Sequence, residues 1–268
     1  MRPELATAIG RFRAARGDVA AGVAGDRLGA GLGASLEPAD VRDYAPGDDV
    51  RRIDWRAYAR TDRLKLKLYR EETSPHVDVL LDVSASMATT DAKACAARDL
   101  VEAWCAWCVA DGGRPRIYAL GGERIEDPAA IAFDGRDVAL APPTAPLRPR
   151  SLRRLVSDFL TPDDPAPLVR RAAAGAAGLA VVQILDPWEV APEVDGVSAL
   201  VDVESGARRD LRWSAAARRD YDARLRRLCD AVREAVRAAG GRYALATAAA
   251  PAALFGGPLL AAGLTEPR

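Results

Sequence analysis

The sequence contains a single histidine, His76, among 268 residues. A serine hydrolase of the usual kind needs an imidazole within hydrogen-bond reach of its nucleophile. His76 begins an apolar stretch, and in an extended chain it lies roughly 20 Å from Asp82, which follows that stretch. The sequence also lacks the Gly-x-x-x-x-Gly-Lys-Ser/Thr pattern of a P-loop. These absences argue against a His-dependent hydrolase and against a nucleotide-binding loop of this type.

The sequence has no excess of either charge, because 38 Lys and Arg residues balance 38 Asp and Glu residues. This balance argues against a nucleic-acid-binding protein that depends on a strong positive field. Four cysteines are too few for a disulfide scaffold and favour a reducing compartment. The most apolar stretch, residues 245–264, is interrupted by Pro251 and Pro258, and the N-terminus lacks the apolar core of a signal peptide. We therefore expect a cytoplasmic protein that does not insert into membranes.

We expect the chain to have three parts. Residues 1–35 are rich in Gly, Ala and Arg, which predicts a short helix and a Gly-rich run, together a flexible N-terminal segment. Residues 36–75 are dense in charged and aromatic side chains and include the run 64–69, whose period of two is typical of a strand with one solvated face. Residues 76–268 form the third part.

The third part alternates predicted strands with predicted helices. Strands are predicted at 77–81, 116–120, 152–157, 179–185, 199–203 and 242–247, and helices at 91–111, 165–177 and 214–239. Strands that alternate with helices of this length indicate right-handed βαβ crossovers. The predicted fold class is therefore α/β and Rossmann-like, with a mainly parallel sheet flanked by helices.

Polar side chains follow two of these strands. Asp82, Ser84 and Ser86 come directly after the strand 77–81, and Asp158 comes directly after the strand 152–157. Ligands of open parallel sheets bind at the carboxyl ends of the strands, so these side chains are expected to face each other across a crevice. Hard oxygen donors suit Mg²⁺ or Mn²⁺ better than Zn²⁺. The spacing alone leaves a second interpretation open, in which Asp82 and the serines cap the following helix.

Two sets of residues resemble known families. The pattern Asp82-x-Ser84-x-Ser86 after an apolar strand resembles the metal-ion-dependent adhesion site of von Willebrand factor A domains. Residues 43–55, Asp-Tyr-x-Pro-Gly-Asp-Asp-x-Arg-Arg-Ile-Asp-Trp, are similar to the signature of the bacterial DUF58 family, as are residues 157–159 and 201–206. The DUF58 resemblance extends from about Leu36 to the C-terminus.

The resemblance implies a von Willebrand A-like domain that follows a family-specific segment. It implies that Asp82, Ser84, Ser86 and Asp158 hold a divalent cation such as Mg²⁺. Adhesion sites usually add a threonine from an intervening loop, and Thr144 is the candidate here, although residues 139–150 are proline-rich and too short to include a full helix. Family members are commonly thought to work beside MoxR-type AAA+ ATPases as adaptors or assembly factors.

The expected function is a non-enzymatic, metal-dependent protein-interaction module that binds a partner's acidic side chain. A haloacid-dehalogenase-like hydrolase would need a second Asp two residues after the first, where Ser84 stands. A metal-dependent hydrolase is therefore a weaker alternative.

The segment 43–55 offers another alternative, a metal-independent scaffold. Its candidate interaction residues are Asp48, Asp49, Arg52, Asp54 and Trp55. A tryptophan flanked by Arg and Asp can pack as a lid whose charges pair with each other, and the same residues can form a docking surface. We favour the packed scaffold and keep the docking surface open.

Overall fold

The computed structural model describes residues 1–15, 38–45, 48, 50–69, 76–128, 131–135, 141–194 and 196–268. The chain divides into two compact units, one formed by Met1–Gly25 with Pro75–Arg268 and the other by Asp26–Ser74. The larger unit is the α/β part of the chain. Its second segment starts one residue before the boundary expected at residue 76.

A six-stranded sheet forms the centre of the larger unit, in the order β11-β8-β7-β4-β5-β6. The strands are β4 (His76–Leu81), β5 (Arg114–Ala119), β6 (Arg124–Ile125), β7 (Leu152–Ser157), β8 (Gly178–Leu185) and β11 (Arg242–Thr247). Neighbouring strands from β11 to β5 run parallel, and the short β6 is antiparallel to β5. The predicted mainly parallel α/β sheet is confirmed.

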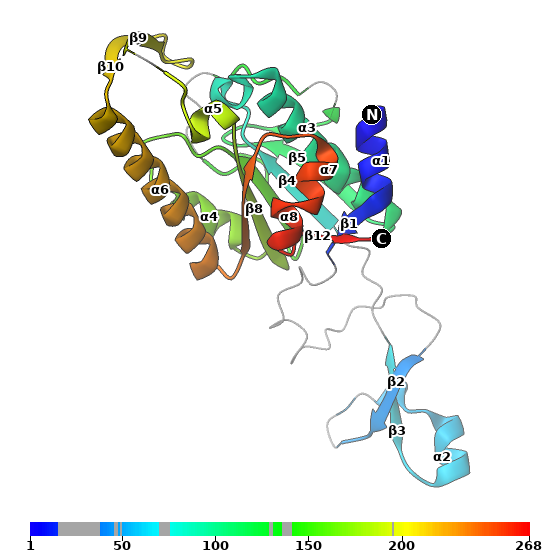
Figure 1. Ribbon diagram of the computed structural model, residues 1–268. Helices are drawn as coiled ribbons and strands as arrows, with labels where there is room; N and C mark the ends of the chain where they lie inside the picture. The colour runs from blue at the N-terminus through cyan, green and yellow to red at the C-terminus, as the bar shows by residue number, and fades with distance from the viewer. Residues whose placement is uncertain are drawn as a thin grey trace. The chain divides into compact units, whose positions relative to one another are not determined.

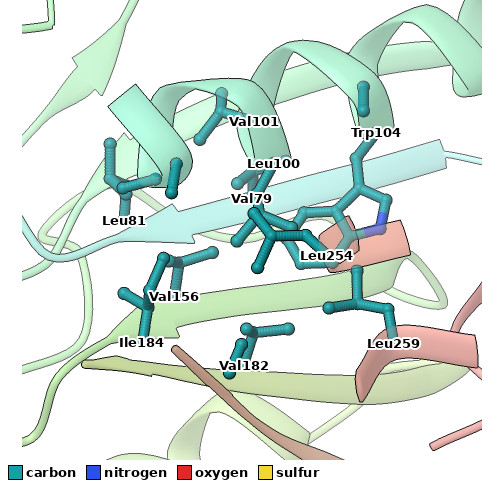
Figure 2. Close-up of a cluster of buried hydrophobic side chains, with 14 of the residues drawn as sticks. Val79, Leu81, Leu100, Val101, Trp104, Val156, Val182, Ile184, Leu254 and Leu259 are labelled. Atoms are coloured by element: carbon teal, nitrogen blue, oxygen red, sulfur yellow. The ribbon is translucent and has the colours of Figure 1, made fainter. Parts of the chain in front are cut away.

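Helices cover both faces of this sheet (Figure 1). The helices are α1 (Pro3–Arg11), α3 (Asp91–Ala110), α4 (Pro165–Ala173), α5 (Pro187–Val190), α6 (Ala215–Ala238), α7 (Pro251–Gly256) and α8 (Pro258–Ala261). Because successive strand residues point to opposite faces, Val79 and Leu81 pack in one hydrophobic cluster while Leu80 packs in another. Figure 2 shows the first cluster, in which Trp104 of α3 lies near side chains of the sheet and of α7 and α8.

The chain's first residues belong to the larger unit. Helix α1 buries Leu5 and Ala8, and β1 (Phe12–Ala14) pairs antiparallel with β12 (Thr265–Pro267). The short helix expected within the segment 1–35 corresponds to α1, and the apolar side chains Leu5, Ala8 and Phe12 pack in the core of the larger unit. The Gly-rich run Gly22–Gly33 lies outside the described residues.

A separate hairpin precedes the long helix α6. It consists of β9 (Gly196–Val201) and β10 (Arg208–Trp213), which pair antiparallel and lie outside the central sheet, near the start of α6 (Figure 1). The sequence predicts a strand at 199–203, which overlaps the end of β9, but it does not predict β10. Strand β10 is rich in Arg and largely exposed, so it lacks the apolar alternation that identifies a half-buried strand.

The smaller unit contains an antiparallel pair and two short helices. These elements are β2 (Pro38–Asp43), the 3₁₀ helix η2 (Val50–Arg52), α2 (Trp55–Thr61) and β3 (Lys65–Tyr69). The predicted strand 64–69 coincides with β3, and α2 was not predicted. Within the described parts of both units, no helix combines the length and apolar character needed to cross a membrane.

Candidate functional site at the carboxyl ends of β4 and β7

Asp82 is held by hydrogen bonds at the end of β4. Its backbone N–H donates to the carbonyl of Val156 at 2.9 Å, which extends the pairing with β7 by one residue. Its Oδ1 accepts from the Ser84 N–H at 2.9 Å, and its Oδ2 accepts from the Ser157 hydroxyl at 2.6 Å. The side chain is buried, so both carboxylate oxygens have a fixed direction.

The two serines lie next to each other after this strand. The hydroxyls of Ser84 and Ser86 are 2.9 Å apart, and the 3₁₀ helix η3 (Ala85–Ala88) follows directly. Helix α3 is capped instead by Thr90, whose hydroxyl accepts from the Lys93 N–H at 3.2 Å. The interpretation of Asp82 and the serines as caps of the following helix is therefore wrong.

Asp158 is positioned by the tight turn that ends β7. Phe159 has φ 56°, a left-handed conformation that is costly for a bulky residue. The turn is fixed because the Phe159 N–H donates to the Ser157 hydroxyl at 2.9 Å and the Phe159 ring is fully buried. The Leu160 N–H then donates to Asp158 Oδ1 at 2.9 Å. Residues 157–159 thus each have a physical role in presenting one carboxylate.

The charge of Asp158 acts on the Asp82 carboxyl, as expected from the places of the two residues at neighbouring strand ends. Burial raises the pKa of the Asp82 carboxyl, and the negative charge of Asp158 raises it further. Hydrogen bonds from Ser157 and Ser84 oppose this shift. Asp82, Ser84, Ser86 and Asp158 are called the strand-end site below.

Lys93, which was not predicted, places an ammonium group beside this site. Its side chain is fully buried. The Nζ donates to Asp158 Oδ2 at 2.7 Å, to Glu189 Oε1 at 2.8 Å and to the carbonyl of Ser86 at 3.0 Å. All three ammonium protons are therefore used. Glu189 is held in turn by the cap of α5, where its Oε2 accepts from the Asp186 N–H at 2.7 Å.

Glu204 lies at the tip of the β9–β10 hairpin, where its N–H donates to Asp202. Partial burial raises the pKa of its carboxyl, a hydrogen bond with Ser86 opposes this shift, and the negative charges of Asp158 and Asp82 add to it. The sequence places Glu204 in the family-like segment 201–206, and no site role was predicted for it.

Thr144 is exposed, and its hydroxyl donates to the carbonyl of Gly122 at 3.0 Å. Residues 141–150 contain no helix, as expected from the short proline-rich loop. Among the described contacts, none joins Thr144 to the strand-end site.

The donors of the strand-end site suit a hard divalent cation. Across the described residues, no three His, Cys, Asp or Glu side chains are grouped so that they could hold a metal ion. The predicted set has two carboxylates and two hydroxyls, which matches Mg²⁺ because this ion keeps several waters and takes few protein ligands. The single positive charge of Lys93 faces the two carboxylates of Asp158 and Glu189. The carboxyl of Asp82 lies near that of Asp158, so the acidic groups outnumber the one basic group. The residues therefore fit a divalent cation in chemistry and in charge.

Two aspartates of the segment 43–55 make local hydrogen bonds with the backbone. Asp48 accepts from the Ala45 N–H at 2.8 Å, and Asp54 caps α2 by accepting from the N–H groups of Arg56 and Ala57 at 3.0 and 3.1 Å. Trp55 is 60% exposed, with its ring edge against Tyr58, so it is not a buried lid. The structure of Asp49 and the side chain of Arg52 lie outside the described residues.

The fold and this site define an α/β protein with a mainly parallel sheet and an acidic, hydroxyl-bearing site at the carboxyl edge. The chain belongs to the DUF58 family, described as "Protein of unknown function DUF58", which matches residues 40–111 and 125–230.

Similar proteins occur in mycobacteria. The chain is 32% identical over 224 residues to the uncharacterized protein Mb1516 of Mycobacterium bovis, covering 74% of this chain and 70% of the relative. The uncharacterized proteins MT1527 and Rv1480 of Mycobacterium tuberculosis match to the same extent. Among solved structures, the conserved hypothetical protein BatB from Bacteroides thetaiotaomicron is similar with a TM-score of 0.36 and 11% identity, over 65% of this chain and 91% of BatB.

Proposed function

We propose that this protein is a non-enzymatic interaction module of the von Willebrand A-like type, with a divalent cation, Mg²⁺, at the strand-end site. The observation that supports this proposal is the pair of buried carboxylates, Asp82 and Asp158, brought together from two strand ends and only partly neutralised by Lys93. The family resemblance supplies the partner class, a MoxR-type AAA+ ATPase, for which the protein acts as an adaptor or assembly factor.

The chain's own residues orient the donors of this site. Ser157 and the Ser84 N–H fix Asp82, while Leu160 and Lys93 fix Asp158. A bound divalent cation supplies positive charge at a position open to a carboxylate of the partner. Such a contact in a half-buried site gains more than an exposed salt bridge, which is worth about 0–1 kcal/mol. Each further 1.4 kcal/mol or so changes the partner's affinity about tenfold.

Calorimetric titration with MgCl₂ tests the metal. We expect one Mg²⁺ per chain, and we expect Asp82→Asn and Asp158→Asn each to weaken binding at least about tenfold, because each removes a charge that faces the ion. Asp210→Asn is the matched control. Asp210 is an exposed carboxylate on β10, so its substitution removes the same charge at a position away from β4 and β7. Equal Mg²⁺ affinity in all four proteins contradicts the metal site.

The same variants test the partner. A purified MoxR-type ATPase from the same genome is expected to bind the wild-type chain with Mg²⁺ present, and to bind it at least about tenfold more weakly after EDTA or Asp82→Asn. Surface plasmon resonance measures these affinities. Binding that is equally strong with EDTA, and in both aspartate variants, rejects a metal-dependent interaction.

The exposed Trp55 supports a second candidate, a metal-independent interaction through the segment 43–55. Because its side chain is 60% exposed, Trp55→Ala is expected to change the free energy of unfolding of the smaller unit by only about 0.5 kcal/mol. If the strand-end site binds the partner, Trp55→Ala also leaves ATPase affinity unchanged. A tenfold loss in that variant, with binding insensitive to EDTA, selects the second candidate instead.

A further inference from the structure

The two edges of the central sheet differ in length and in protection. One edge is β6, which has only two residues and includes the charged Arg124. The other edge is β11, a strand of six residues that pairs only with β8 among the described strands. Residues 243–247 of β11 contain no charged side chain, proline or bulge, the features that usually stop an edge strand from pairing with another chain. The edge of β11 is therefore suited to receive one more strand.

A groove with a volume of about 610 Å³ adjoins this edge. Its apolar lining comes from β8, α5 and the residues after it, α6 and β11, and consists of Leu185, Val190, Ala191, Pro192, Leu225 and Leu245. Val190 and Leu245 are 40% and 38% exposed, so this lining is open to solvent. On α6 the lining extends from Arg218 to Arg233, which is roughly 22 Å at 1.5 Å per residue, or the length of about seven extended residues. The groove therefore matches a short strand segment in length.

Arginines of α6 lie along the same groove. Among the described contacts, Arg218 and Arg226 make no ion pair, and both are exposed. Arg233 pairs with Asp230, and Asp222 completes the charged lining, so arginines outnumber aspartates. Arg218 and Arg226 are eight residues apart on one helix, roughly 12 Å. Acidic residues four positions apart on an extended strand are separated by roughly 13 Å. An extended segment with this acidic spacing complements the groove in charge.

We propose that β11 and this groove bind an extended segment of a partner protein, which pairs with the edge of β11 as an added strand. Its acidic side chains at i and i+4 contact Arg218 and Arg226, and an apolar side chain at i+2, on the same face, enters the apolar lining. A second copy of this chain is a poorer occupant, because residues 242–247 of β11 offer no acidic side chain. This surface goes beyond the proposed function, since β8 separates β11 from β7 and no metal takes part.

A synthetic peptide tests this surface. The probe is acetyl-Thr-Glu-Val-Leu-Val-Glu-Thr amide with a fluorescent label, and fluorescence anisotropy in EDTA measures its affinity for the whole chain. We expect Arg226→Glu to weaken binding at least about tenfold, because it replaces an attraction with a repulsion. Arg227→Glu is the matched control and should bind as wild type, since Arg227 is exposed on the same helix and does not line the groove.

Variants of the peptide test the strand pairing. Two further probes carry N-methyl groups on alternate residues, one on the Glu and Leu residues and the other on the Val residues. Because alternate N–H groups of a strand face its neighbour, one of these probes should lose at least about tenfold in affinity while the other binds like the parent peptide. A probe with Lys in place of both Glu residues should lose at least about tenfold as well, because its charges repel the arginines.

Failure of this proposal is distinguishable from failure of the strand-end site. No probe binding to the wild-type chain, equal affinities of Arg226→Glu and Arg227→Glu, or equal affinities of the two N-methylated probes each overturns strand addition at β11 and leaves the metal site unaffected. Binding that appears only when Mg²⁺ replaces EDTA, and is lost in Asp82→Asn, also overturns it, because the probe's carboxylates then bind at the strand-end site. A dimer in sedimentation velocity that Arg226→Glu dissociates assigns the groove to a second copy instead.

Discussion

Replacing Lys93 with methionine is expected to lower the free energy of unfolding by about 3–5 kcal/mol in the absence of divalent cations. The ammonium is fully buried and donates to the carboxylates of Asp158 and Glu189 and to the carbonyl of Ser86. Methionine has similar length but no charge, so the variant leaves two buried carboxylates without their cation. Urea-induced unfolding, followed by circular dichroism, measures the loss.

Two controls separate this effect from a general effect of removing a lysine. Lys65→Met, in the smaller unit, removes a partly exposed lysine and should change stability by less than about 0.5 kcal/mol. Glu189→Gln removes one of the two carboxylates of the same cluster, so combining it with Lys93→Met should cost less than the sum of the single changes. A loss under about 1 kcal/mol in Lys93→Met would contradict a role for the ammonium in balancing these charges.

Lys93→Met also distinguishes a site that binds Mg²⁺ from a site whose only cation is the Lys93 ammonium. If Mg²⁺ binds at the strand-end site, Lys93→Met removes a repelling positive charge, so Mg²⁺ affinity should rise and saturating Mg²⁺ should restore part of the lost stability. If Lys93 is the resident cation of a metal-independent site, Mg²⁺ restores nothing. Thermal unfolding with and without MgCl₂ reads out this difference directly.

The fold was largely predictable because its strands are buried on both faces. Runs such as residues 77–81 and 179–185 are almost continuously apolar, which is typical of central parallel strands between two helical layers. Strand β10 and helix α2 were missed for the opposite reason. Both are rich in Arg and mostly exposed, so local hydrogen bonds and hairpin pairing form them without an apolar pattern.

Only the site residues that directly follow strands, such as Asp82 and Asp158, could be predicted from the sequence. Asp82 and Asp158 follow adjacent parallel strands, and their proximity is a consequence of sheet topology. Lys93 and Glu204 come from a helix and from a hairpin tip, and no spacing rule connects them to Asp82. One signal was available: Lys93 is one of three lysines in a chain whose other basic residues are arginines, and it lies in the helix directly after the serines. A compact ammonium fits a buried position where a planar guanidinium would not.

Asp78→Asn is expected to cost about 3–5 kcal/mol of stability at the opposite end of β4. Asp78 is fully buried and accepts from the backbone N–H, Nε and Nη2 of Arg148 at 3.0, 2.8 and 2.6 Å, and from the Ser151 hydroxyl at 2.7 Å. The Arg148 guanidinium also donates to the carbonyls of Val77 and Arg114. The asparagine keeps the shape but presents N–H donors to other donors and leaves the guanidinium without a counter-ion.

This cost should be separate from the strand-end site. Asp78 lies roughly 13 Å along the strand from Asp82, so Asp78→Asn should leave Mg²⁺ affinity unchanged while Lys93→Met, with a similar loss of stability, raises it. Urea unfolding and MgCl₂ titration of the two variants side by side test this. Equal Mg²⁺ affinities in the two variants would mean that Lys93 acts only through the stability of the fold. Opposite ends of β4 then differ: the Asp78–Arg148 ion pair anchors the proline-rich loop, and the Asp82 end carries the proposed binding site.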